Sequence, residues 1–157
     1  MDNNKVDLAI SIAKDAHHTD RYGKHPYFDY HIEGVVSLIK FDFQETDSLE
    51  LKNELIIVAY LHDVLEDHPD VVDLAMIQKL FSDKIAQAVD AISKECYQTK
   101  DEYLQVVLNN ELARRVKIAD STFNMYNCII ENNFKRAKSY RKNVEFLLNG
   151  ACIPPLK

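Results

Sequence analysis

Four side chains that bind metals or transfer protons stand close together in the stretch AYLHDVLEDH. They are His62, Asp63, Glu66 and Asp67. On a helix they would share one side, because residues three or four positions apart are neighbours on its surface. Three carboxylates beside an imidazole on a half-buried face repel one another, and a bound cation would offset that repulsion. The stretch therefore indicates a metal site with acid–base groups beside it.

The apolar segment ELIIVAYL leads into this stretch and predicts the helix that positions it. Leu51, Leu55, Val58 and His62 recur at helical period, so the stripe that faces the core ends in an imidazole. We expect this helix to extend from about Ser48 to Glu66. A His-Asp pair alone is usually inert, so a metal site requires matching ligands from other elements.

Two other predicted helices supply such ligands. His31 lies near the start of a helix expected from about Asp29 to Phe41, on the face that points into the core. Asp120 lies on the edge of an apolar stripe in a later helix. An ordinary salt bridge to Arg114 or Lys117 is the alternative role for Asp120.

A basic, aromatic loop follows the first predicted helix, which runs from about Lys5 to His18. Gly23 and Pro26 indicate the loop, and Arg21 and Lys24 supply its cations. Cations suit phosphate groups, and rings or guanidinium planes stack on bases, so the loop predicts nucleotide contacts. An ordinary polar surface loop is the alternative.

Two further features have common structural explanations. His17 ends the buried stripe of the first helix, and most single histidines on such faces are packing residues rather than ligands. Basic residues crowd the first half of the last predicted helix, from about Phe134 to Leu148. A solvated face usually explains such a run, and a phosphate-facing edge is the alternative.

The composition predicts an all-α protein. The chain has 157 residues with only three glycines and four prolines, which favours long helices. Hydrophobic residues make up 46% and charged residues 28%, as in ordinary globular proteins. We expect one compact domain, residues 1–157, built of about seven or eight helices.

The charge and the cysteines limit the class of partner. A net charge of −6 argues against nucleic acid, which needs a basic footprint. No apolar run approaches membrane-spanning length, and the first residues lack the core of a signal peptide. Cys96, Cys128 and Cys152 lie far apart without CxxC spacing. We therefore expect a cytoplasmic protein without a membrane partner that acts on a small molecule, and its oligomeric state stays open.

The order His31, His62-Asp63, Asp120 resembles the HD-domain family of metal-dependent phosphohydrolases. Within it, the segments HPYFDYH, LHDVLED and IADSTFN resemble three boxes of the alarmone hydrolases. That group comprises the Rel/Spo-type hydrolase domain and the free-standing small alarmone hydrolases. The resemblance extends over nearly the whole chain, and LHDVLED is its most specific part because most other HD proteins lack the Glu-Asp pair.

The resemblance implies a helical HD-domain fold, a divalent metal and a nucleotide substrate. It implies His31, His62, Asp63 and Asp120 as metal ligands. The family metal is usually manganese, and iron, nickel or zinc would also suit these donors. Glu66 and Asp67 match the catalytic pair. The implied substrate is guanosine tetra- or pentaphosphate, hydrolysed to GDP or GTP and pyrophosphate.

The match is weaker on the substrate side. Arg21 matches the first residue of an Arg-Lys pair in the base-binding loop, and Asn124 a position near the ribose and phosphates. Tyr22 stands where the lysine would be, with Lys24 as its candidate replacement, and Ser121 stands where the family has Arg or Lys. Two alternatives follow. The chain acts on another nucleotide or phosphorylated small molecule, or it is a non-catalytic metal- and nucleotide-binding sensor.

Overall fold

A computed structural model describes residues 3–93 and 99–150, and in this part of the chain it confirms the all-α prediction. Eight α-helices of at least seven residues account for most of the described structure. They are α1 (Asn3–Ala16), α2 (Glu33–Phe41), α3 (Leu49–Leu61), α5 (Leu74–Leu80), α6 (Asp83–Ile92), α7 (Lys100–Leu108), α8 (Glu111–Ile130) and α9 (Phe134–Gly150). The smaller elements are the hairpin of β1 (Arg21–Tyr22) and β2 (His25–Pro26), the π-helical turn Phe28–Ile32 and the four-residue helix α4 (Val64–Asp67).

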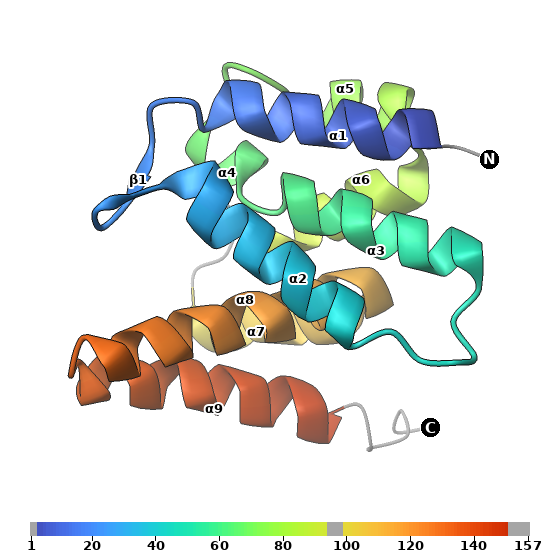
Figure 1. Cartoon of the computed structure of the whole chain (residues 1–157). Coiled ribbons are helices and arrows are strands. Elements are labelled where there is room, and N and C mark those ends of the chain that lie inside the picture. The colour runs from blue at the N-terminus through green and yellow to red at the C-terminus, as the bar shows by residue number, and fades with distance from the viewer. Residues whose placement is uncertain (1–2, 94–98, 151–157) are drawn as a thin grey trace.

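The helices pack in layers around one core (Figure 1). α8 and α9 form an antiparallel pair along one side, α1 covers the opposite side, and α2 and α3 lie between them. α2 contacts both α3 and α8, and α1 packs on α3. Three of the largest fully buried side chains are histidines, namely His17, His31 and His62. Since burying polar groups is costly, these imidazoles need hydrogen-bond or metal partners.

Local sequence signals fix where several helices begin. Five N-cap side chains each accept a hydrogen bond from a backbone N–H of the first turn, which would otherwise lack an acceptor. They are Ser48, Asp73, Ser82, Thr99 and Asn110. Thr99 and Glu102 also form a reciprocal capping box.

The prediction of one helix from Ser48 to Glu66 is wrong, because two helices occupy this range. α3 ends at Leu61, and α4 begins at Val64. At this break, His62 Nε2 lies 3.0 Å from Asp63 Oδ2.

The predicted loop after α1 contains the β1–β2 hairpin, and its turn uses Gly23 at φ +59°. The helix expected from Asp29 instead starts one residue earlier as the π-helical turn, and His31 lies buried in this turn. The sequence predicts a break between helices at CYQTKDEY, residues 96–103. Residues 96–98 of this segment lie outside the described residues, and its second half already belongs to α7, which begins at Lys100. Within the described ranges, the search for membrane spans finds no helix of sufficient length and apolarity.

Candidate metal centre and its cavity

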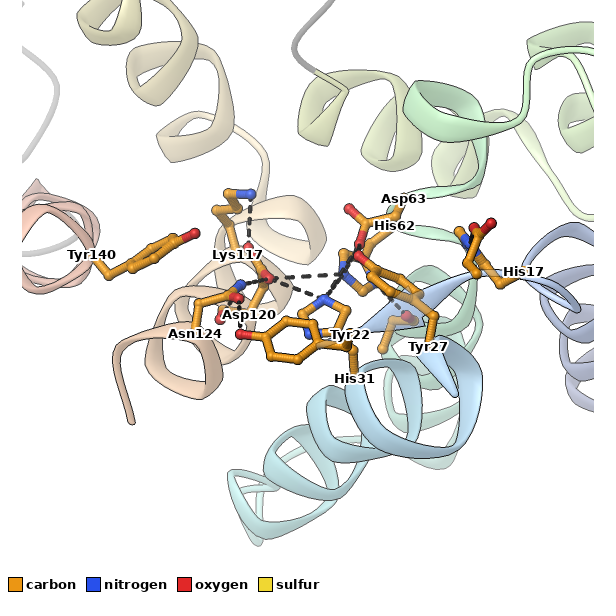
Figure 2. A network of polar contacts seen from close by, with 12 residues as sticks. His17, Tyr22, Tyr27, His31, His62, Asp63, Lys117, Asp120, Asn124 and Tyr140 are labelled. Atoms are coloured by element: carbon orange, nitrogen blue, oxygen red, sulfur yellow. Dashed lines mark hydrogen bonds and ion pairs between the residues drawn. The ribbon is translucent and has the colours of Figure 1, made fainter. Parts of the chain in front are cut away.

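The four predicted metal ligands converge on one point (Figure 2). The Nε2 atoms of His31 and His62 lie 3.3 Å apart. Asp63 Oδ2 lies 3.3 Å from the first nitrogen and 3.0 Å from the second. Asp120 Oδ1 lies 3.4 Å and 3.9 Å from the same two atoms. Donors from the π-helical turn, the α3–α4 break and α8 are thus gathered at one place, as the sequence predicted.

Neighbouring groups hold three of these side chains in place. The Nδ1 atom of His62 lies 2.7 Å from the carbonyl oxygen of Ala59, which turns its Nε2 toward the centre. The Tyr27 hydroxyl donates to Asp63 Oδ2 at 2.6 Å. Asp120 turns its Oδ1 toward the imidazoles while its other carboxylate oxygen receives a salt bridge from a lysine of α8.

That lysine is Lys117, whose Nζ lies 2.8 Å from Asp120 Oδ2. It is buried, although lysine is rarely buried without a partner. The salt-bridge alternative for Asp120 is therefore confirmed, and the same carboxylate also faces the histidines. The spacing of three residues along a helix is a sequence signal for this pair.

The charges of the cluster favour a cation at its centre. Complete burial alone would lower the pKa of His62, but Asp63 and Asp120 raise it to about 9. Burial would raise the pKa of Asp120, but Lys117 and His62 lower it. The cluster thus favours positive charge, and imidazole nitrogens with carboxylate oxygens are ordinary ligands of divalent metals. The described residues fit a divalent metal site.

A cavity of about 520 Å³ opens beside this centre. Volumes of this order suit a small-molecule ligand. The predicted catalytic pair, Glu66 and Asp67, lines it together with Arg21 and Asn124. Lys24 is exposed at the hairpin tip and is not among the described lining residues, so its proposed contact stays a prediction.

Asp67 of this pair lies where its charged form is disfavoured. Partial burial, followed by the charges of Asp63 and Glu66, raises the pKa of Asp67. A carboxyl whose pKa is raised is suited to act as a general acid.

Tyr22 lines the cavity next to the centre. Its ring stacks on His31, with centroids 5.2 Å apart and planes 7° from parallel. Its hydroxyl donates to Asn124 Oδ1 at 2.8 Å, and the Asn124 amide donates to Asp120 Oδ1 at 2.6 Å. These contacts were not predicted, because no local pattern relates residues this far apart in the chain.

The far wall of the cavity comes from α9. Arg136 and Tyr140 line it, and the Arg136 Nη2 donates to the Tyr140 hydroxyl at 3.2 Å. Figure 2 shows Tyr140 across from Lys117 and Asn124. Of the basic run on this helix, Arg136 therefore faces the candidate site, whereas the sequence favoured a solvated face.

The chain is similar to a known protein in its fold. No family model matches the chain, and no curated protein matches it in sequence. Among solved structures, the chain is similar to a metazoan ortholog of SpoT that hydrolyses ppGpp and plays a role in starvation responses. The match covers 96% of this chain and 93% of that chain, with 20% sequence identity and a TM-score of 0.68. The chain therefore has the fold that its resemblance to the alarmone hydrolases implied.

Proposed function

We propose that this protein is a metal-dependent phosphohydrolase, and specifically a guanosine 3′,5′-bis(diphosphate) 3′-pyrophosphohydrolase. The convergence of His31, His62, Asp63 and Asp120 beside an acidic pair is the observation that carries this proposal. The shared fold supports the substrate, because the similar solved protein hydrolyses ppGpp. We further propose that residues 1–157 form one HD-type domain that works in the cytoplasm.

The four converging side chains would hold the metal, for which we propose Mn²⁺. A bound divalent cation would supply a Lewis acid that lowers the pKa of a water and offsets charge on the phosphate. Tyr27 and Lys117 keep the two carboxylates turned toward this point, because each bonds directly to one of them.

Glu66 and Asp67 carry the proton transfers in this proposal. Glu66 orients the attacking water and accepts its proton. The water oxygen forms a bond to the phosphorus atom that is attached to the 3′-oxygen, and the bond between that phosphorus and the 3′-oxygen breaks. Asp67, whose pKa is raised by partial burial and by the charges of Asp63 and Glu66, donates a proton to the leaving 3′-oxygen. GDP or GTP and pyrophosphate are the products.

Arg21, Lys24 and Asn124 are proposed to bind the nucleotide. Arg21 of β1 and Asn124 of α8 both line the cavity. A guanidinium suits a base or a phosphate, and the amide suits ribose hydroxyls. Asn124 already bonds to Tyr22 and Asp120, so the nucleotide would replace the Tyr22 contact.

The deciding experiment is hydrolysis of guanosine tetraphosphate by manganese-reconstituted protein, with pyrophosphate and orthophosphate followed separately. We expect pyrophosphate release that disappears in Glu66→Gln. Tight nucleotide binding without turnover in any metal would instead identify a sensor and contradict the proposed hydrolase.

A second candidate is hydrolysis of a different nucleotide, and Tyr22 favours it. Tyr22 belongs to the loop that should recognise the base, and its ring covers one face of His31. A panel of nucleotides in the same assay distinguishes the candidates. Release of orthophosphate from another nucleotide, with no action on guanosine tetraphosphate, would support this alternative.

A further inference from the structure

A second group of metal-binding side chains lies beside the first centre. His17 Nδ1 and His68 Nε2 approach the same carboxylate oxygen, Asp20 Oδ2, at 2.8 Å and 2.6 Å. One ligand atom from each of the three residues lies within 4.8 Å of the other two. They come from the end of α1, the segment before β1 and the end of α4. This group shares no residue with the four ligands described above.

The surrounding structure holds His17 in position. Its ring is fully buried and packs against Tyr27, with centroids 4.9 Å apart. The His68 ring lies edge-on to it, with centroids 4.8 Å apart. A side chain fixed in advance loses little freedom when it binds a ligand, so the position of His17 favours binding.

We propose that His17, Asp20 and His68 form a second site for a divalent transition-metal ion, distinct from the first centre. Two imidazole nitrogens and one carboxylate oxygen are ligands that zinc, iron and nickel all accept. The Asp20 and His68 side chains are 29% and 21% exposed, which leaves room for water to complete the coordination.

An ion would need only a small adjustment. The present separations are hydrogen-bond lengths, whereas ligand atoms around a tetrahedral zinc ion lie roughly 3.3 Å apart at its usual bond lengths. The partly exposed Asp20 and His68 side chains are free to move by this amount, while His17 stays fixed in the core.

The second ion would join two parts of the candidate active site. His68 directly follows Glu66 and Asp67 in α4, and Asp20 directly precedes Arg21 in β1. Tyr27 lies between the two centres, because its ring contacts His17 and its hydroxyl donates to Asp63. We therefore expect this ion to fix the acidic pair relative to the base-binding loop.

Equilibrium dialysis of the full chain against zinc, followed by elemental analysis, tests the site. We expect two ions per wild-type chain and one in His68→Gln. Asp63→Ala, which damages only the first centre, should also retain one. His18→Gln is the matched control, because His18 is exposed and contacts the Asp15 carbonyl, not this cluster. It should bind as many ions as the wild type.

The outcomes separate this proposal from the proposed function. If His68→Gln binds as much zinc as the wild type, the second site is overturned. A single wild-type ion that Asp63→Ala removes also overturns it and leaves the proposed hydrolase intact. A single ion that only His68→Gln removes supports the second site and contradicts the metal basis of the hydrolase. If circular dichroism shows that His68→Gln does not fold, Asp20→Asn, which keeps an amide in place of the carboxylate, decides in the same way.

Discussion

At the scale of single residues, the metal centre depends on groups that would not themselves touch the ion. Tyr27→Phe removes the hydrogen bond to Asp63 and keeps the ring that packs on His17 and His31. Losing such a supporting contact typically lowers metal affinity about 10- to 100-fold. Manganese titration of the purified variant measures this change. Tyr126→Phe, on the exposed face of α8, is the control and should bind like the wild type.

Glu66 tests the chemistry apart from the metal. Glu66→Gln keeps the side-chain length but cannot accept a proton, so turnover should fall by about 100-fold or more. Manganese affinity should stay within a few-fold of the wild type, because Glu66 is not among the converging ligands. Single-turnover assays and metal titration measure the two quantities. Asp70→Asn, at an exposed acid beyond α4, is the control, and full activity in Glu66→Gln would exclude this residue as the base.

At the scale of elements, the close contact of α2 with α8 supports the site. A Cβ on Gly34 would overlap the ring of Phe123. That ring lies edge-on to His31, with centroids 5.3 Å apart. Overpacking of this kind costs about 1–3 kcal/mol. We expect Gly34→Ala to lower the free energy of unfolding by this amount in urea titration and to weaken manganese binding, although alanine favours helix.

A second substitution in the same variant tests whether the Phe123 ring causes the effect. Combining Gly34→Ala with Phe123→Leu removes the ring that causes the overlap. Metal affinity in the double variant should then exceed that of Gly34→Ala alone. If Gly34→Ala is as stable as the wild type, the close contact between α2 and α8 does not limit the stability of the fold.

The connection between α2 and α3 is held by an arginine of α8. The two terminal guanidinium nitrogens of Arg115 donate to Asp47, at 2.8 Å and 3.1 Å, and its Nε donates to Asp42 at 3.2 Å. These hydrogen bonds hold the pKa of Asp47 below its usual range. Arg115→Met should therefore lower the urea midpoint at neutral pH, and Arg114→Met at the neighbouring position is its control.

The pH dependence of this effect has a fixed sign. A carboxyl whose pKa is depressed in the folded state stabilises the fold above its unfolded pKa of about 3.9. That contribution disappears as the pH falls through the folded pKa. The difference in midpoint between wild type and Arg115→Met should shrink below about pH 4. A difference that is constant with pH would mean that Arg115 acts through packing alone.

At the scale of the whole molecule, metal binding should stabilise the fold. The four ligands span residues 31 to 120 and converge only in the folded state. An ion that binds only the folded state at 100 times its dissociation constant adds about 2.7 kcal/mol to the free energy of unfolding. We expect manganese to raise the melting temperature by roughly 5–10 °C and a chelator to reverse the shift. Asp63→Ala should lose most of this response, and an unchanged melting temperature would contradict the site.

The sequence by itself predicted the helical class and four side chains that the structure brings together. Apolar periodicity and the scarcity of glycine and proline carry the first prediction, because both act through local backbone preferences. The second prediction rests on the resemblance of His31, His62, Asp63 and Asp120 to a known family pattern, and on the need of buried acids beside histidines for a cation.

Only the tertiary structure decided the break between α3 and α4, the place of Tyr22 on His31, and the cluster of His17, Asp20 and His68. The break interrupts the helix that the apolar pattern predicts. At this point His62 and Asp63 contact residues of distant elements, which local periodicity does not report. The other two features join residues from different elements. Periodicity reports which face of a helix is buried, whereas packing determines which buried faces meet.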